Sequence, residues 1–250
     1  MKLVYIKRIK TTKNSIFYSF INFKNEIIGF GRKHYGTERI IKKVILNNNF
    51  DIIEDNNILF RGEDPRCFEY KNKLYILDNY LSDMHLIDYE NKNYIKINIS
   101  GKNISFINHN DNLYFIHYIK PFSLYKFDID TNSIIPIEVN DDKNTYNYEY
   151  RGGTSGYKLN ENEYYGFGHR TYYKNKIMIH DIFKWTVYFE NDKLPTITII
   201  NIDKPINSKN ICDPTSIIEI KNKKYLITAE TDRPWSRDQD YITNVYEIVV

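Results

Sequence analysis

Five stretches of this sequence repeat one pattern, in which a short apolar segment, a polar turn and a second aromatic or aliphatic segment follow one another. They span residues 17–32, 67–79, 104–118, 154–170 and 215–230. The turns contain Asn beside Lys, Asp or Glu, as in Lys24-Asn25 and Lys71-Asn72. Alternating apolar segments that flank such turns are typical of β-hairpins. The pattern therefore predicts five hairpins.

Further strand-like segments follow the hairpins. They are Met84–Tyr89, Tyr94–Ile99, Ser123–Ile129, Ile134–Val139, Lys176–Phe183, Trp185–Phe189 and Thr196–Ile202. Ile242–Val249 supplies one outer strand of the fifth unit, and Leu3–Ile9 supplies the other. Five repeated units of about four strands predict an all-β protein, a five-bladed β-propeller in which the N-terminal strand closes the last blade. We expect one domain over residues 1–250. A two-sheet sandwich is the alternative, and the five matched hairpins favour the propeller.

Composition narrows the class of protein. The 250 residues include 23 Tyr and 14 Phe but only 10 Gly and 7 Pro, which excludes a largely disordered or collagen-like chain. No apolar run is long enough for a membrane-spanning helix, and Lys and Arg interrupt the N-terminal apolar stretch, so we expect a cytoplasmic protein without a membrane partner. The net charge of +3 predicts no nucleic-acid partner. Cys67 and Cys212 are expected to be buried, reduced thiols, and an oligomer is possible.

Unusual residues gather where one face of such a propeller would lie. The start of an inner strand and the end of the next strand meet at the same face. Three segments lie at or just before the starts of inner strands: Gly62–Arg66, Tyr150–Thr154 and Asp213–Thr215. The residues near the ends of second strands are Arg32, Asn79, Tyr118, His169, Arg170, Glu230 and Asp232. Taken singly, each motif fits an ordinary turn. Their concentration on one face favours a polar binding site.

Two of these motifs carry a family resemblance. The run Arg61-Gly62-Glu63-Asp64-Pro65-Arg66 resembles the Glu-Asp-Pro-Arg signature of the β-mannoside phosphorylases, which are five-bladed-propeller glycosidases grouped with related β-1,2-mannosyltransferases. Arg151-Gly152-Gly153-Thr154, followed by Phe167-Gly168-His169, resembles a second motif of that family, although Ser155 stands where the family has proline. Arg32, the stretch Ile211–Thr215 and Asp232 extend the resemblance over roughly residues 15 to 235.

The resemblance implies a role for each candidate residue. Asp64 would be the general acid, acting directly or through a sugar hydroxyl. The residues implied for phosphate binding are Arg32, Arg151, His169 and Arg170. The residues implied for substrate binding are Arg66, Asn79, Tyr118, Asp213 and Asp232. Inorganic phosphate or a sugar phosphate would be the co-substrate. We expect no cofactor and no metal, since the six histidines show no metal-ligand spacing.

Three other functions stay open. The cationic residues could hold the phosphate of a nucleotide sugar, which would make the protein a glycosyltransferase. A second carboxylate from Glu63, Asp213, Glu230 or Asp232 could activate water, which would make it a glycoside hydrolase. The propeller could also be a non-catalytic glycan- or protein-binding module. In each case, aromatic side chains could stack on sugar rings, and the candidates are Tyr80, Tyr118, Tyr172 and Trp235.

Overall fold

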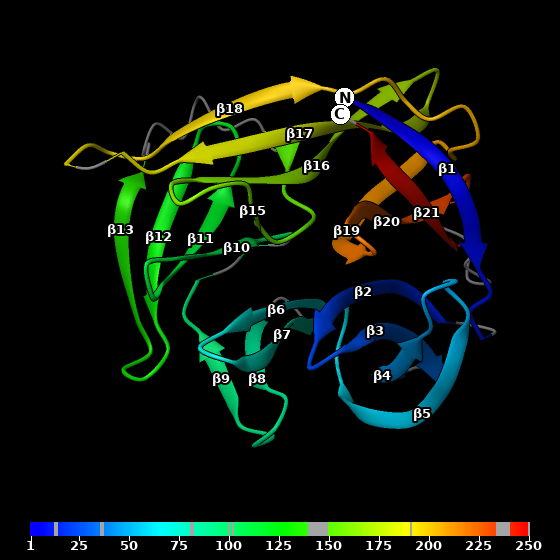
Figure 1. The fold of residues 1–250 in the computed structure, drawn as a ribbon, viewed down its shortest axis with the longest axis horizontal. Coiled ribbons are helices and arrows are strands. Elements are labelled where there is room, and N and C mark those ends of the chain that lie inside the picture. Colours follow the sequence, from blue (N-terminus) through cyan, green and yellow to red (C-terminus); the bar gives the residue numbers. More distant parts are fainter. Residues whose placement is uncertain are drawn as a thin grey trace.

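The computed structural model describes residues 1–12, 15–35, 38–80, 83–99, 101, 103–139, 150–190, 192–233 and 241–249. Five antiparallel sheets surround a common axis, which confirms the predicted five-bladed β-propeller (Figure 1). In the first four blades the first strand in the sequence is innermost, whereas in the fifth blade the N-terminal strand is outermost. Neighbouring blades contact one another close to the axis. Within the described residues, no helix is long and apolar enough to cross a membrane.

In blades 1 to 4 the strands follow in chain order from the inside outward, and in blade 5 the N-terminal strand is added on the outside. Blade 1 contains β2 (Ser15–Phe23), β3 (Glu26–Tyr35), β4 (Glu38–Leu46) and β5 (Ile52–Arg61). Blade 2 contains β6 (Arg66–Tyr70), β7 (Lys73–Tyr80), β8 (Asp83–Asp88) and β9 (Tyr94–Ile97). Blade 3 contains β10 (Ser105–His109), β11 (Asn112–Tyr118), β12 (Ser123–Asp128) and β13 (Ser133–Val139). Blade 4 contains β14 (Tyr150–Arg151), β15 (Tyr157–Lys158), β16 (Glu163–Lys174), β17 (Ile177–Tyr188) and β18 (Thr196–Asn201). Blade 5 contains β19 (Ile211–Ile220), β20 (Lys223–Thr231), β21 (Ile242–Val249) and β1 (Lys2–Ile9).

The N-terminal strand closes the ring, as predicted. β1 pairs antiparallel with β21, with Lys2 opposite Val249 and Ile9 opposite Thr243. The two termini therefore lie side by side at the outer edge of blade 5 (Figure 1). The pairing covers the outer edge of β21 with a strand from the other end of the chain, so blade 5 joins the two ends of the sequence.

Tight turns join the inner strands to their neighbours in four blades. Lys24 and Asn25 have φ values of 47° and 66°, and Lys71 and Asn72 have 49° and 59°. The corresponding pairs in blades 3 and 5 are Asn110-Asp111 and Lys221-Asn222. Two consecutive positive φ values are the signature of the type I′ turn, whose twist matches that of the flanking strands. The Asn- and Asp-containing turns found in the sequence thus set the hairpin register.

Each contact between neighbouring blades encloses its own apolar cluster. Phe68 of blade 2 stacks on Phe106 of blade 3, with ring centroids 4.1 Å apart. Trp185 lies fully buried between blades 3 and 4. Cys67 and Cys212 are free and buried within two other clusters, as expected. Burial raises the pKa of the Cys67 thiol to about 12, so this group is protonated.

Blade 4 differs from the sequence expectation. The hairpin predicted over 154–170 calls for one unbroken inner strand, but β14 and β15 are two-residue strands that pair with separate parts of β16. Between them the chain passes close to other backbone segments. A Cβ atom at Gly153 would lie 2.6 Å from the carbonyl oxygen of Pro214 and 2.8 Å from that of Phe167. The close approach admits only glycine there and interrupts the strand.

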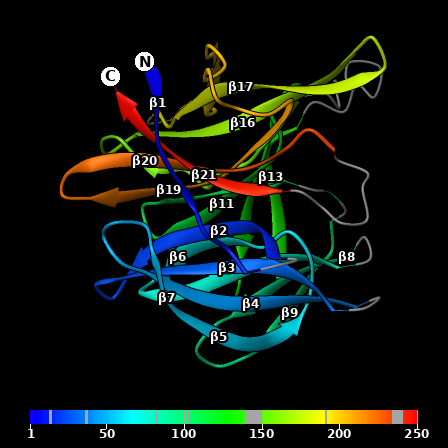
Figure 2. The same ribbon diagram turned by 90° about the vertical axis from the view of Figure 1, so that its right-hand side faces the viewer.

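The second strand of blade 4 continues past its predicted end at Arg170, and the third strand is unbroken. β17 is one continuous strand of 12 residues, where the sequence suggested two segments. β16 has the same length and pairs with β17 from Glu163 to Lys174. In Figure 2 this hairpin extends to the upper right of the view.

Candidate active site

The sequence motifs meet at one end of the propeller. We call the end at which inner strands begin and second strands end the motif face, and the end that carries the hairpin turns the turn face. Register places Ser15 opposite Lys33, Arg66 opposite Leu77 and Ile211 opposite Thr231. The starts of inner strands therefore lie beside the ends of second strands, as the sequence analysis expected.

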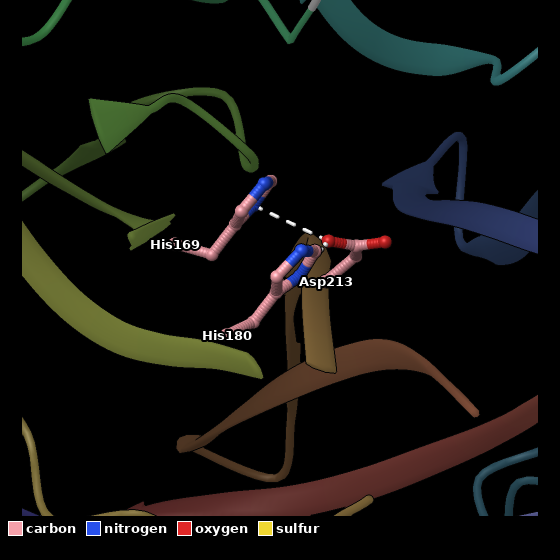
Figure 3. A group of neighbouring side chains, drawn as sticks. All are labelled: His169, His180 and Asp213. Carbon is pink, nitrogen blue, oxygen red and sulfur yellow. Dashed lines mark ion pairs between the residues drawn. The ribbon is translucent and has the colours of Figure 1, made fainter. Parts of the chain in front are cut away.

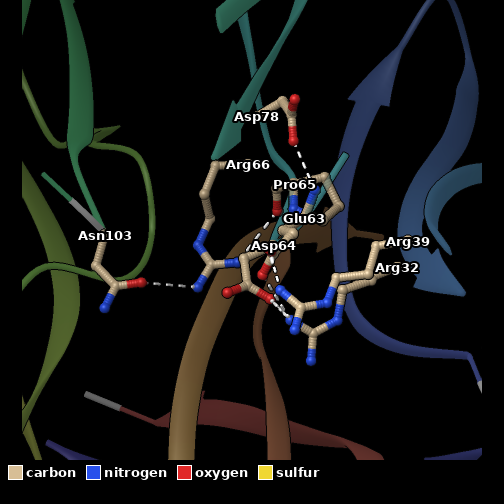
Figure 4. A network of polar contacts seen from close by, with 8 residues as sticks. All are labelled: Arg32, Arg39, Glu63, Asp64, Pro65, Arg66, Asp78 and Asn103. Carbon is tan, nitrogen blue, oxygen red and sulfur yellow. Dashed lines mark hydrogen bonds and ion pairs between the residues drawn. The ribbon is translucent and has the colours of Figure 1, made fainter. Parts of the chain in front are cut away.

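Asp64 is held by an arginine from the neighbouring blade (Figure 4). Nη1 of Arg32 donates to Oδ1 of Asp64 at 2.8 Å and lies 3.4 Å from Oε2 of Glu63. Arg39 binds the other oxygen of Glu63. Asp64 has a φ of 46°, a left-handed conformation that Asp and Asn tolerate better than most residues. The result is a carboxylate placed beside a guanidinium on the motif face, with its side chain partly exposed.

Arg66 is buried and joins the two sequence motifs. Its Nε donates to the carbonyl oxygen of Gly153 at 2.9 Å, and Nη1 donates to that of Pro65 at 3.1 Å. Nη2 donates to Oδ1 of Asn103 at 3.4 Å. Only 2% of Arg66 is exposed. The Arg66 guanidinium thus fixes the main chain of both motifs. Its N–H donors lie in one plane and point in several directions, which suits it to bind several carbonyl groups.

A buried carboxyl supports the loop that carries Asp64. Oδ1 of Asp78 accepts the backbone N–H of Glu63 at 2.6 Å, and the N–H of Asn79 donates to the carbonyl of Glu63 at 3.1 Å. A Cβ atom at Gly62 would lie 2.4 Å from the same Asp78 oxygen, so this close approach needs glycine. Burial raises the pKa of Asp78 to about 7. Sequence reasoning named Asn79 and missed Asp78. The position of Asp78 near the end of a second strand could have identified it as a residue of the motif face.

A second group gathers around Asp213 (Figure 3). The rings of His169 and His180 stack with centroids 4.2 Å apart and planes 12° apart. Nδ1 of His180 lies 2.7 Å from Oδ1 of Asp213, and Nδ1 of His169 lies 3.3 Å from it. Burial, with a smaller effect from His180, lowers the pKa of His169 to about 3, so this imidazole is neutral. The sequence singled out His169 and Asp213 but not His180, which β17 brings beside His169.

Arg151 and Arg170 lie on opposite faces of blade 4. Register pairs Arg151 with His169 and Tyr150 with Arg170. Side chains of successive residues point to opposite faces of a strand, so Arg151 shares the face of His169 and Arg170 does not. The guanidinium of Arg170 lies over Tyr150 at 5.9 Å and over Tyr172 at 5.3 Å, with cation–π geometry.

The two groups of the motif face share electrostatic neighbours. Burial lowers the pKa of Arg66, and the charges of Asp64 and Asp213 act in the opposite direction. Tyr241 lies near both carboxylates and Arg32, and its pKa is raised, mainly by burial. Its ring packs on Phe17 with centroids 4.7 Å apart. Sequence reasoning missed Tyr241, which immediately precedes β21.

The remaining candidate residues lie at strand ends on the motif face or outside the described residues. Asp232 is exposed, pairs with Lys209 at 2.9 Å and accepts the N–H of Asn210 at 2.9 Å. Glu230 is fully buried and accepts the hydroxyl of Tyr246 at 2.7 Å. Tyr118, at the end of β11, is half-buried beside His117, with ring centroids 4.1 Å apart. Trp235 and the side chain of Tyr80 lie outside the described residues.

A separate cavity opens on the turn face. Its volume is about 520 Å³, and Phe68 and Phe106 form part of its wall beside Lys71, Asp111 and Lys158. Most of the described residues that line it belong to hairpin turns and inner strands, and the lining also includes Ser155, Gly156 and Tyr164 of blade 4 but neither Asp64 nor Asp213. The polar groups around Asp64 and Asp213 therefore stand apart from this cavity.

Comparison with known proteins gives a likeness of fold. No family model and no curated protein matches the sequence. MPT-4, a mannose phosphorylase from Leishmania mexicana solved with a phosphate ion, is 12% identical with a TM-score of 0.64, over 98% of this chain and 88% of that chain. A thermostable family-43 glycoside hydrolase is 14% identical with a TM-score of 0.65, over 99% of this chain and 93% of that chain. An exo-β-1,3-galactanase from Phanerochaete chrysosporium solved with galactose is 8% identical with a TM-score of 0.68, over 100% of this chain and 65% of that chain.

Proposed function

We propose that this protein is a carbohydrate-active enzyme that cleaves or forms a glycosidic bond by inverting transfer to or from phosphate, with a β-mannoside as the expected substrate. The observation that carries the proposal is the pairing of Asp64 with Arg32 at 2.8 Å on the motif face. It puts a group that can transfer a proton beside a group that can bind phosphate.

The chemistry needs one acid and one anion site. A protonated Asp64 would give its proton to the leaving glycosidic oxygen, directly or through a sugar hydroxyl. A phosphate oxygen would attack the anomeric carbon from the opposite side of the sugar ring. The old carbon–oxygen bond breaks as the carbon–oxygen bond of the sugar phosphate forms. Arg32 and Arg151 are the proposed phosphate ligands, because a guanidinium can bind two phosphate oxygens at once in a bidentate contact.

The other carboxylates of the motif face are paired with groups of the protein, as Asp64 is with Arg32, so none of them stands out as the base that activated water would need. A hydrolase needs a second carboxylate as its base. Glu63 is bound by Arg32 and Arg39, and Asp213 lies between two imidazoles. Glu230 is bound by Tyr246, and Asp232 by Lys209. Each of these candidates is thus engaged by the protein in the structure.

The similar folds support the same choice of substrates. One belongs to a mannose phosphorylase in complex with phosphate, and others belong to glycoside hydrolases. At identities of 8–14%, these likenesses do not transfer an activity. They make sugars and phosphate the first compounds to test.

The test is a synthesis screen. The protein is incubated with mannose 1-phosphate or GDP-mannose and a panel of mono- and disaccharide acceptors, and products are identified by mass spectrometry. We expect a new glycoside and released phosphate from mannose 1-phosphate. Product from GDP-mannose alone would instead make the protein a nucleotide-sugar-dependent transferase. No product from either donor would contradict the proposal and favour a hydrolase or a binding module.

Asp64→Asn tests the acid. Asn keeps the size of the side chain and tolerates the positive φ at this position, so the loop should persist. We expect the rate of product formation to fall by a factor of about 100 or more. Asp83→Asn, at an exposed carboxylate paired with Lys96, is the matched control and should retain full activity. Equal activity of the Asp64→Asn variant and the natural protein would remove Asp64 from the mechanism.

A further inference from the structure

Three ligand-type atoms converge beside the proposed sugar site. Nδ1 of His169, Nδ1 of His180 and Oδ1 of Asp213 are buried and lie close to one another, but among the described residues none of these atoms makes a hydrogen bond of acceptable geometry. The three residues are 3%, 6% and 7% exposed. Buried polar atoms without such partners are uncommon and call for an explanation. We propose that His169, His180 and Asp213 bind a divalent transition metal, with Zn²⁺ as the best match.

The spacing of the three atoms suits one ion. Zinc bonds of about 2.0–2.1 Å in tetrahedral geometry put neighbouring ligand atoms about 3.3 Å apart. Here Oδ1 of Asp213 lies 3.3 Å from Nδ1 of His169 and 2.7 Å from Nδ1 of His180. All three ligand atoms lie within 4.8 Å of one another. Binding one ion through both Nδ1 atoms would also require the nearly parallel rings to turn about their Cβ–Cγ bonds, so that the metal lies in the plane of each ring.

The three side chains come from strands that hold them in place. His169 lies on β16, His180 on β17 and Asp213 on β19. β16 and β17 pair along their full length, and both contact β19. The nearly parallel stacking of the two imidazoles presents both Nδ1 atoms to the same carboxylate (Figure 3). Sites built on strands in this way keep their geometry better than sites on loops.

The donor set identifies the class of metal. Two imidazole nitrogens and one carboxylate oxygen suit Zn²⁺ and its neighbours, whereas Mg²⁺ and Ca²⁺ prefer oxygen ligands. Three protein ligands are also the number found in sites that leave one position open. Arg66 and Arg151 lie within electrostatic range of His169, so the open position of a bound metal would favour an anion. This proposal departs from the sequence-based expectation of no metal, and it does not depend on the proposed glycoside chemistry.

The competing explanation is an ion pair without metal. A protonated His180 could approach Asp213 at the observed 2.7 Å and need no other ligand. The two explanations differ in what Zn²⁺ does. An ion pair predicts no specific uptake of the metal, whereas a metal site predicts uptake of one ion per chain and a loss of affinity when either imidazole is removed.

The experiment is a Zn²⁺ titration of untagged protein that has first been freed of metal with a chelator. Isothermal calorimetry should give one site per chain for the natural protein. His180→Gln should weaken binding by about 100-fold or more, since it removes one of three ligands. His109→Gln is the control, because His109 is also buried and ring-stacked, on Phe189 at 4.2 Å, but lies outside the group. Absence of binding to the natural protein below about 10 µM, or equal binding by both variants, would overturn the proposal.

A second measurement covers the case in which His180→Gln does not fold. Co²⁺ is added to the metal-free natural protein, and its visible absorption is recorded. A tetrahedral site with nitrogen and oxygen ligands gives intense d–d bands. We expect these bands and their loss on addition of Zn²⁺. Only the weak bands of octahedral Co²⁺, as for the free ion, would overturn the proposal.

Discussion

Arg66 donates the hydrogen of its Nε to the carbonyl oxygen of Gly153 at 2.9 Å, which joins blade 2 to blade 4. The two residues are 87 positions apart in the sequence. The same guanidinium binds the carbonyl of Pro65, next to Asp64. The acidic loop and the glycine segment are thus fixed to each other through one buried side chain.

Arg66→Lys is expected to destabilise the protein. An ammonium group cannot reproduce the three directions in which the guanidinium donates, so buried carbonyl groups would lose partners. We expect a loss of about 2–4 kcal/mol in the free energy of unfolding, measured by urea denaturation. Arg61→Lys is the control, because Arg61 pairs with Glu38 in an exposed position and should change stability by less than about 0.5 kcal/mol. Equal stability of the two variants would contradict the role assigned to Arg66.

Gly153→Ala is expected to disturb the same junction. Its methyl group would lie 2.6 Å from the carbonyl oxygen of Pro214, and backbone atoms cannot move aside as a flexible side chain can. We expect a cost of about 2–4 kcal/mol in the free energy of unfolding, measured by thermal or urea denaturation. Ser155→Ala provides the contrast, since the buried Ser155 hydroxyl has no hydrogen-bond partner among the described residues and its removal should be close to neutral. A neutral Gly153→Ala variant would show that this junction is not tightly packed.

Asp78→Asn is expected to change the pH dependence of stability. The pKa of Asp78 is about 7 in the folded protein, against 3.8 for an ordinary aspartate. Between these values the folded state binds more protons than the unfolded state, so the free energy of unfolding falls as pH rises from about 4 to 7. Asn stays neutral, and its Oδ1 can still accept the N–H of Glu63. The variant should therefore be more stable than the natural protein at pH 8, by about 1–3 kcal/mol.

The measurement for Asp78 is a set of urea unfolding curves from pH 4 to pH 8. The stability difference between Asp78→Asn and the natural protein should grow across this window. Asp83→Asn should give a curve parallel to that of the natural protein, because Asp83 is exposed. A constant difference between Asp78→Asn and the natural protein would mean that the Asp78 carboxyl does not titrate in this range.

Tyr246→Phe tests the buried bond to Glu230. Oε1 of Glu230 accepts hydroxyl groups from Tyr246 at 2.7 Å and Thr228 at 2.6 Å. Removal of the tyrosine hydroxyl leaves a fully buried carboxylate with fewer donors, which should cost about 1–3 kcal/mol in the free energy of unfolding. Tyr173→Phe, at a side chain that is 64% exposed, should be neutral in the same denaturation assay. Similar values for both variants would show that Glu230 gains nothing from Tyr246.

The sequence by itself determined the architecture, because the features that encode it are local. Alternating apolar residues and turns such as Lys71-Asn72 predict hairpins from neighbouring residues alone, and five matched hairpins favour a propeller over a two-sheet sandwich. The direction of the strands then fixes which residues reach the same end. On that basis alone, Arg32, Asp64 and Arg66 could be assigned to one face of the molecule.

Tertiary structure decided which side chains touch. His180 lies beside His169 because of the register of β16 and β17, and Asp213 reaches both from the next blade. Arg170 was grouped with Arg151 in the sequence analysis, but strand alternation puts them on opposite faces of blade 4. Burial, which raises the pKa of Asp78, is likewise a property of the assembled blades. Such contacts depend on residues far apart in the chain, and no local pattern specifies them.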